Sequence, residues 1–213
     1  MTCSQCVGLE KVFNEKYVTK ELKDYRKKGP VKTTLWLIEA FKEAGVKGLD
    51  LLDIGGGVGA IQHELVEAGV SRVTGVDAAS AYILAVQEEA KRRGYVERTT
   101  QLHGDFVDLA PRLAQADIVT LDRVICCYHD MDSLVKASVG LAKKYYGVIT
   151  PRFEWWTKMG ARIENLFVGL FGNPYRAYVH PTDRIEAIVK EKGFQRQYYR
   201  QTPLWQVVVY GRG

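Results

Sequence analysis

The feature that most constrains this chain is a run of glycines directly behind a short apolar segment. Leu51, Leu52 and Asp53 lead into four glycines within positions 55–59, and a helical stretch follows. Glycine tolerates positive φ and leaves no Cβ in the way of a ligand. The first turn of the helix that follows offers unpaired N–H groups. The stretch therefore predicts a strand, a tight turn and a helix start at which a nucleotide-like ligand contacts bare backbone.

Short β-rich segments alternate with helical segments through the middle of the chain. The strands are predicted at Asp50–Ile54, Arg72–Val76, Thr99–Leu102, Ile118–Leu121 and Gly147–Thr150. The helices are predicted at Ala60–Ala68, Ala81–Arg93, Ala110–Ala114 and Ser133–Lys144. Such alternation predicts a parallel sheet covered on both faces. Right-handed crossovers then give a doubly wound fold.

The two ends of the chain complete this α/β prediction. Helices are expected at Glu10–Lys28, Val31–Ala44 and Arg184–Glu191, and strands at Phe194–Arg200 and Trp205–Tyr210. The last two strands must be antiparallel, because a parallel pair needs a longer crossover than the short link that contains Gln201, Thr202 and Pro203. The expected fold is a doubly wound, mostly parallel seven-strand sheet ending in an antiparallel hairpin. It forms a single domain over residues 1–213, with a helical cap at 1–30 and an aromatic-rich, lid-like insert at 153–180.

Composition sets broader bounds on the protein. A chain of 213 residues can bury a substantial core in one large domain. The net charge of +5 fits an anionic partner as well as an ordinary solvated surface. No apolar run approaches the ~20 residues of a membrane span, and the N-terminus lacks the apolar core of a signal peptide. Four cysteines do not suggest a disulfide scaffold, so a cytoplasmic location is expected.

Three carboxylates follow three consecutive predicted strands. Asp53, just before the glycine turn, would repel a pyrophosphate and suit a ligand that carries an ammonium group. Asp77 can accept hydrogen bonds from both ribose hydroxyls. Asp105, after Gly104, can accept from an adenine amino group, and Phe106 can cover the base. Each aspartate alone could be a turn or cap residue. Together, at the edge where open sheets bind ligands, they favour S-adenosylmethionine over NAD.

These motifs resemble those of the class I, seven-strand S-adenosylmethionine-dependent methyltransferases over roughly residues 31–213. The first motif of that family is matched by Leu52-Asp53-Ile54-Gly55-x-Gly57-x-Gly59, its second-strand acid by Asp77, and its adenine-side motif by residues 104–106. Within the family the chain is similar to the magnesium-protoporphyrin and ubiquinone-type O-methyltransferases. The resemblance implies S-adenosylmethionine as methyl donor, S-adenosylhomocysteine as product and no required metal. It implies cofactor contacts at Asp53, Gly55, Gly57, Gly59, Asp77, Ala78, Gly104, Asp105, Phe106, Leu121 and Asp122.

In that family the segment after the fourth strand faces the transferable methyl group, and here it is residues 121–130. Methyl transfer is an in-line displacement that alignment can accelerate, and a base is needed only for an acceptor proton of high pKa. Cys127, Tyr128 and His129 are the candidate bases. The porphyrin enzymes have His-Tyr-Pro at these three positions, which argues against magnesium protoporphyrin as substrate here. Tyr25, in the helix expected to cover the site, could orient the acceptor, touch the cofactor or pack on the domain.

The insert is the expected specificity element. Its apolar residues near one helical face are Trp155, Met159, Ile163, Leu166, Phe167 and Leu170. Lys158 and Arg162 lie beside them, so the insert could be a lid over a hydrophobic or anionic aromatic acceptor. The helix over residues 153–171 could instead lie on a membrane surface as a peripheral contact, or pack on the sheet.

The cysteines occur in two pairs, Cys3 with Cys6 and Cys126 with Cys127. If the N-terminal segment folds over the pocket, four thiols could hold a soft metal or form a redox pair. Neither pattern is specific, and no metal is assigned to the site.

Three other functions compete with methylation of a small molecule. A nucleic-acid methyltransferase would use the basic pairs at 27–28 and 92–93, but no Asn/Asp-Pro-Pro-Tyr element follows the fourth strand. A non-catalytic module would bind S-adenosylmethionine without turnover. A nicotinamide dehydrogenase is disfavoured by Asp53 and the terminal hairpin. The sequence leaves open the acceptor, the atom methylated and the oligomeric state.

Overall fold

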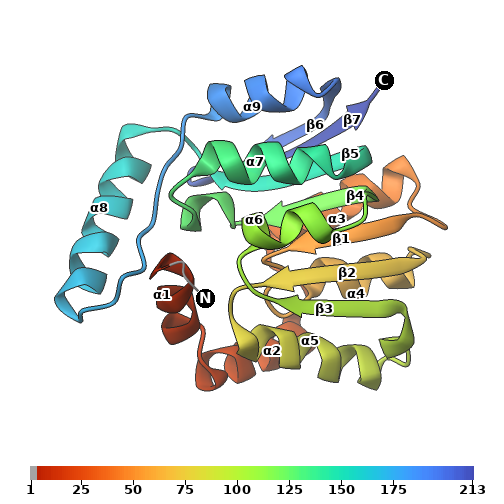
Figure 1. The fold of residues 1–213 in the computed structure, drawn as a ribbon, viewed down its shortest axis with the longest axis horizontal. Helices are drawn as coiled ribbons and strands as arrows, with labels where there is room; N and C mark the ends of the chain where they lie inside the picture. The colour runs from red at the N-terminus through yellow and green to blue at the C-terminus, as the bar shows by residue number, and fades with distance from the viewer. Residues whose placement is uncertain (1–3) are drawn as a thin grey trace.

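The computed structural model describes residues 4–213, whose strands form one mixed sheet of seven (Figure 1). The strand order is β3-β2-β1-β4-β5-β7-β6. The strands are β1 (Asp50–Ile54), β2 (Arg72–Asp77), β3 (Thr99–His103), β4 (Ala116–Asp122), β5 (Ala142–Pro151), β6 (Phe194–Gln201) and β7 (Trp205–Arg212). The first five pair in parallel, while β7 pairs antiparallel with both β5 and β6. The predicted α/β fold with its terminal hairpin is confirmed.

Helices cover both faces of the sheet. The α-helices are α1 (Ser4–Val12), α2 (Glu15–Lys28), α3 (Lys32–Ala44), α4 (Ala60–Glu67), α5 (Ser80–Arg92), α6 (Phe106–Leu109), α7 (Met131–Gly140), α8 (Trp155–Leu170) and α9 (Thr182–Glu191). Short 3-10 turns lie at Val96–Arg98, Ala110–Arg112 and Ile125–Cys127. In Figure 1, α6, α7 and α9 lie in front of the sheet, with α3 and α4 behind it. This two-sided cover is what a parallel sheet requires.

Adjacent residues of the buried strands supply two separate cores. Leu51 joins the core formed with α3 and α4, whereas Leu52 joins the core formed with α6, α7 and α9. Val207 and Val208 divide in the same way, because successive side chains of a strand point to opposite faces. Helix α3 approaches β5 closely at Gly147, where a Cβ would lie 2.6 Å from the Phe41 ring. The continuous apolar character of these strands thus follows from burial on both sides.

Three predicted helices differ from the observed ones. The helix expected over Glu10–Lys28 is two helices, because Asn14 caps α2 by accepting from the backbone N–H of Tyr17. The helix expected over Ser133–Lys144 ends at Gly140, and β5 begins two residues later. The helix expected over Ala110–Ala114 is a 3-10 turn that contains Pro111 and continues the short α6.

The insert comprises α8 and an irregular segment, residues 171–180, which we call the strap. Figure 1 shows α8 standing apart from the sheet, with the strap returning between it and α7. The strap also contacts α1, since the Asn173 side-chain amide donates to the Gly8 carbonyl at 3.4 Å. A Cβ on Gly8 would lie 2.5 Å from the Tyr175 backbone nitrogen, so α1 and the strap touch at backbone level. Both segments therefore lie beside the carboxyl ends of the strands.

Within residues 4–213, we find no helix that combines the length and the apolar character needed to cross a bilayer.

Candidate active site

The glycine loop forms the turn between β1 and α4. Gly55, Gly57 and Gly59 have φ values of 61°, 57° and 79°, a region that residues with a Cβ rarely adopt. Gly59 is the residue before α4, and the Gly55 N–H donates to the Val76 carbonyl at 2.7 Å. The loop is therefore fixed against the carboxyl end of β2, and the side chains of Val124 and His63 pack closely against Gly55 and Gly59.

Asp77 ends β2 directly beside this loop. Its carboxylate accepts hydrogen bonds from the backbone N–H groups of Gly57, at 3.3 Å, and Ala79, at 2.9 Å. Burial nevertheless raises the pKa of Asp77 to about 7, which outweighs the effect of these two donors. The neighbouring Ala78 carbonyl lies 3.1 Å from His103 Nε2. A ligand with further hydrogen-bond donors would favour the charged form of Asp77.

Asp53 does not lie at the mouth of the site, where the sequence analysis placed it. Its side chain is fully buried and accepts from Thr120 Oγ1 at 2.6 Å and Gln62 Nε2 at 3.0 Å. A Cβ on Gly56 would lie 2.2 Å from Asp53 Oδ2, so the carboxylate sits against the underside of the loop. Burial raises the pKa of Asp53 to about 6. The observed geometry is that of a group that braces the turn from within.

Asp105 follows β3 and is contacted from three directions. It caps α6 by accepting from the Val107 N–H at 2.9 Å. The Tyr128 hydroxyl lies 3.1 and 3.0 Å from its two carboxylate oxygens, and Cys6 Sγ lies 3.6 Å from Oδ2. Gly104 connects this acid to the Asp77 carbonyl through a 2.9 Å backbone hydrogen bond. The two acids thus lie at neighbouring strand ends.

Phe106 does not take the position expected of a residue that covers a base. It is buried in the core that α6 shares with α7 and α9. Leu121 is likewise fully buried in that core, so any ligand contact at this point of β4 would be through its backbone.

The end of β4 carries a strained arginine. Arg123 has φ 60° and is the one non-glycine residue with positive φ between residues 4 and 213. Its guanidinium donates to the hydroxyls of Thr33, at 2.8 Å, and Thr34, at 3.2 Å, at the start of α3. It also lies 5.4 Å from the centre of the Trp205 ring. Strained backbone of this kind persists where the surroundings over-determine it, which is common at functional sites. Arg123 was not predicted from the sequence, because no motif indicates an arginine with left-handed backbone.

Asp122, just before Arg123, has an incompletely satisfied carboxylate. Its Oδ2 accepts from the Thr34 hydroxyl, whereas Oδ1 is buried and lacks a hydrogen-bond partner among the described residues. Arg123 Nε lies 3.6 Å from Oδ1, an ion-pair distance rather than a hydrogen bond. Burial raises the pKa of Asp122 above its usual range. A cationic donor placed here would satisfy this oxygen.

The candidate bases occupy the turn after β4. Cys127 Sγ lies 3.6 Å from the Tyr175 hydroxyl of the strap and 3.8 Å from Cys126 Sγ. The adjacent Cys127 thiol, together with burial, raises the pKa of Cys126 well above its ordinary value. Tyr128 directs its hydroxyl to the acid after β3, while His129 is exposed and stacks on the Tyr128 ring at 5.3 Å. The structure therefore brings Cys127 and Tyr128 to the strand ends and leaves His129 on the solvent side.

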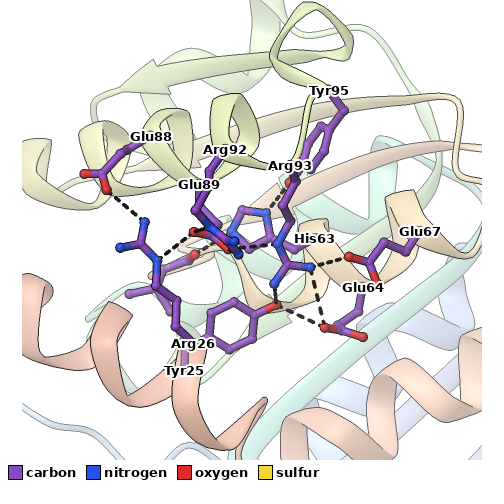
Figure 2. Close-up of polar contacts among 11 residues, drawn as sticks. Tyr25, Arg26, His63, Glu64, Glu67, Glu88, Glu89, Arg92, Arg93 and Tyr95 are labelled. Carbon is purple, nitrogen blue, oxygen red and sulfur yellow. Dashed lines mark hydrogen bonds and ion pairs between the residues drawn. The ribbon is translucent and has the colours of Figure 1, made fainter.

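Tyr25 lies elsewhere, which corrects its assignment to the catalytic set. Figure 2 shows its hydroxyl donating to Glu64 on α4 and accepting from Arg93 at the end of α5, at 3.1 and 3.0 Å. Its ring is buried and stacks on His63. Burial raises the pKa of Tyr25 well above its usual value. Tyr25 joins α2 to α4 and α5 and does not reach the end of β4.

The strap supplies contacts that the sequence did not predict. The Tyr178 N–H donates to the Cys126 carbonyl at 2.8 Å, and His180 Nε2 lies 2.9 Å from the Tyr128 carbonyl. Burial lowers the pKa of His180, which favours its neutral form. The clustering of aromatic residues at 153–180 was the available signal, but it did not say which of them reach the site.

The structure tests only part of the hypothesis that the four cysteines bind a metal. Cys3 lies outside the described residues, and Cys6 Sγ lies 3.6 Å from Asp105 Oδ2. From Ser4 onward, three or more His, Cys, Asp or Glu side chains nowhere gather in a way that could hold a metal ion. Among the described residues, Cys6, Cys126 and Cys127 form no disulfide with one another.

The sheet order, the glycine loop and the acids at successive strand ends define the class I, S-adenosylmethionine-dependent methyltransferase fold. Residues 52–144 match the family model described as "Methyltransferase domain". Over these residues the chain is similar to methyltransferase domains, and its fold is that of the class I methyltransferases.

Solved structures agree with this fold. Magnesium protoporphyrin IX methyltransferase from Synechocystis PCC 6803, with S-adenosylhomocysteine bound, has a TM-score of 0.64 at 21% identity, over 96% of this chain and 85% of that chain. N-methyltransferase NodS from Bradyrhizobium japonicum WM9, with S-adenosylhomocysteine, has a TM-score of 0.63 at 13% identity, over 92% and 97%. The [4+2]-cyclase SpnF has a TM-score of 0.62 at 12% identity, over 83% and 80%. No curated protein sequence matches the chain.

Proposed function

We propose that the protein transfers the methyl group of S-adenosylmethionine to a small, hydrophobic or aromatic molecule by in-line displacement. The observation that carries this proposal is the placement of Asp77 and Asp105 at neighbouring strand ends beside the glycine loop. Two solved relatives of the same fold are described with S-adenosylhomocysteine bound. We take residues 1–213 as one catalytic domain that acts in the cytoplasm, since four cysteines in a chain of this size do not suggest a disulfide scaffold.

The residues present fit this cofactor. Asp77, with its raised pKa, would gain from the two ribose hydroxyls as further donors. Asp122 Oδ1, buried without a hydrogen bond among the described residues, would gain from the ammonium group of the methionine moiety. Asp105 would accept from the adenine amino group in exchange for its contacts with Tyr128 and Cys6. The bound cofactor would supply the electrophilic methyl group, and a glycine such as Gly57 has no Cβ to keep it from the backbone.

The protein's own part in the reaction is alignment of the acceptor. Cys127 and Tyr128 lie at the strand ends where an acceptor proton could be held, whereas His129 would need to turn inward from solvent. Arg123, whose side chain keeps 33% of its exposure, is placed to hold an anionic group of the acceptor. Magnesium protoporphyrin is disfavoured as acceptor, because Cys127 stands where the similar enzymes have histidine.

Calorimetry with S-adenosylhomocysteine and with NADH tests the cofactor. We expect S-adenosylhomocysteine to bind and NADH not to bind, and Asp77→Ala to lose most of the affinity because the ribose loses its acceptor. Tighter binding of NADH would overturn the assignment.

Turnover tests the reaction itself. Release of S-adenosylhomocysteine is measured with a panel of phenols, catechols, aromatic acids and quinols, and with RNA as a separate arm. We expect turnover with a member of the small-molecule panel. Cofactor binding without turnover on any acceptor would support the non-catalytic alternative, and turnover on RNA alone would support the nucleic-acid alternative.

A further inference from the structure

Helix α8 turns an apolar stripe toward solvent. Its members are Trp155, Met159, Ile163, Leu166, Phe167 and Leu170, all classed as exposed. Trp155, Leu170 and Leu166 keep 72%, 71% and 64% of their exposure. Residues three and four apart share a helix face, so these side chains form one continuous stripe. An exposed apolar patch of this extent marks an interaction surface.

The opposite side of α8 faces the protein through small and polar residues, of which Thr157 is buried and Ala161, Asn165 and Val168 are half-buried. Asn165 donates to the Ala177 carbonyl at 2.8 Å and accepts from the Ala177 N–H, which ties α8 to the strap. Thr157 is buried and donates to the carbonyls of Arg152 and Glu154. An ordinary surface helix has the reverse arrangement, with its apolar face inward. The exposed stripe is therefore not a displaced part of the core, because the hydrogen bonds of Asn165 and Thr157 hold the opposite side of the helix against the protein.

The charges beside the stripe are mainly positive. Lys158 and Arg162, one turn apart, flank it on one side, and Glu164 is the single acidic residue within α8. Lys158 Nζ lies 3.4 Å from the centre of the Phe153 ring, so the ammonium group stays at the border of the apolar surface. The chain as a whole carries a net charge of +5. This combination is complementary to an anionic surface with an apolar interior.

The position of α8 favours a lipid surface, rather than an acceptor bound beneath the helix, as the partner of the stripe. Figure 1 shows α8 at the outer edge of the molecule, with the strap between it and the strand ends. Its stripe cannot close over Cys127 in this arrangement, because the strap already contacts that residue through Tyr175. Tryptophans begin the helix and Phe171, 86% exposed, ends it, and such aromatic residues favour the membrane–water interface.

We propose that α8 docks the protein on an anionic lipid bilayer, with its apolar stripe at the boundary between headgroups and acyl chains and Lys158 and Arg162 among the headgroups. Docking in this orientation brings the strap and the strand ends close to the lipid. A hydrophobic acceptor dissolved in the membrane then reaches the site without crossing water. The docking stands on α8 alone, whereas delivery of the acceptor rests on the proposed function.

Vesicle flotation tests the docking on the full chain. The probes are phosphatidylcholine vesicles with and without phosphatidylglycerol, at low and high salt. We expect binding to the anionic vesicles that weakens with salt, together with a blue shift of tryptophan emission. The pair Leu166→Gln and Leu170→Gln should reduce the partition coefficient at least about tenfold, since each apolar side chain contributes to insertion. Lys158→Glu with Arg162→Glu should abolish the preference for anionic vesicles.

A matched control uses exposed leucines outside α8. Leu84 and Leu204 keep 67% and 55% of their exposure, so Leu84→Gln with Leu204→Gln changes the surface by a similar amount. We expect this pair to bind vesicles like the unmodified chain. Equal loss in both pairs, or no binding to anionic vesicles, would overturn the docking. A dimer in solution that Leu166→Gln with Leu170→Gln dissociates would assign the stripe to a second copy instead.

Calorimetry with S-adenosylhomocysteine on the same samples separates the two proposals. Vesicle binding without cofactor affinity would overturn the proposed function and leave the docking intact. Cofactor affinity without vesicle binding would overturn the docking alone.

Discussion

The carboxyl group of Asp77 is only partly ionised at neutral pH. Burial raises its pKa to about 7, although two backbone N–H groups donate to it. In the protonated form it loses acceptor capacity for the two ribose hydroxyls. If Asp77 binds the ribose as we propose, the ionised form binds it better, and we expect cofactor binding to be coupled to loss of a proton from Asp77.

The affinity for S-adenosylhomocysteine should therefore rise with pH. With a pKa of about 7 in the free protein, affinity increases up to about tenfold per unit between about pH 6 and 7 and levels off near pH 8. Calorimetry across this range, in buffers of different ionisation enthalpy, measures both the affinity and the proton released. Asp77→Asn should bind more weakly and show a flat profile. A flat profile for the unmodified chain would show that ionised Asp77 does not hold the ribose.

At the residue scale, the position of a candidate site residue could be predicted from the sequence only where that residue directly follows a strand. The glycine spacing and the acids Asp77 and Asp105 follow from the ends of β1, β2 and β3, so they could be placed in advance. The burial of Asp53 beneath the loop depends on Gln62 and Thr120, which come from other elements. Long-range packing of this kind leaves no local pattern in the sequence.

At the scale of elements, one buried carboxylate holds α2 and α5 together. Glu89 has a side chain with no exposure, and it accepts from Arg26 on α2 at 2.8 Å and from Arg92 and Arg93 at the end of α5 (Figure 2). These arginines hold the pKa of Glu89 well below its usual range. A carboxyl group whose pKa is lowered by folding stabilises the folded state at pH values above its pKa in the unfolded chain. This stabilisation is lost as the pH falls toward the lowered pKa.

Removing that carboxylate should destabilise the protein much more than removing its neighbour. Glu89→Ala leaves three guanidinium groups without their shared partner, and we expect a loss of about 2–4 kcal/mol in the free energy of unfolding. Glu88→Ala breaks an exposed ion pair with the same Arg26, and we expect a change within about 0.5 kcal/mol. Urea unfolding at neutral pH measures both. Similar losses for the two variants would mean that burial of Glu89 adds nothing.

The contact between α3 and β5 sets a second element-scale expectation. In Gly147→Val, the new Cβ would lie 2.6 Å from the Phe41 ring and 2.9 Å from Leu37, so α3 must shift. We expect a loss of about 1–3 kcal/mol or more from overpacking. Gly140→Ala, at the end of α7 with nothing within 4 Å of the new Cβ, should be neutral or stabilise by up to about 1 kcal/mol. Thermal melts distinguish the two, and equal melting temperatures would contradict the close approach.

Element bounds followed from the sequence where burial and periodicity agree. The predicted Asp50–Ile54 strand coincides with β1, whose residues 51–54 are all buried between two helical layers. The boundary at 140–144 was wrong, because Lys143 and Lys144 suit a helix surface by propensity. They belong to β5, where Lys143 pairs with Asp117 of β4 at 3.2 Å. Tertiary pairing overrode local preference at that point.

For the whole molecule, cofactor binding should appear as global stabilisation. Because a ligand that binds only the folded chain adds about 2.7 kcal/mol at one hundred times its dissociation constant, we expect S-adenosylhomocysteine to raise the melting temperature by about 5–10 °C for a chain of this size. Asp105→Ala should reduce the shift, since the adenine loses its acceptor. A thermal scan with NADH alongside is the control, and a larger shift with NADH would contradict the cofactor assignment.

Helix α1 joins two parts of the molecule that are far apart in sequence. At one end of this helix Glu10 accepts from the backbone N–H and the hydroxyl of Ser80 at the start of α5, and Gly8 touches the strap. Nearer the start of the helix, Cys6 Sγ lies 3.6 Å from Oδ2 of Asp105, the acid expected to bind adenine. If product leaves past α1, these contacts must separate first. The slow step of each catalytic cycle is then expected to be the opening of α1, so rapid-mixing experiments should show a burst of product before the steady rate.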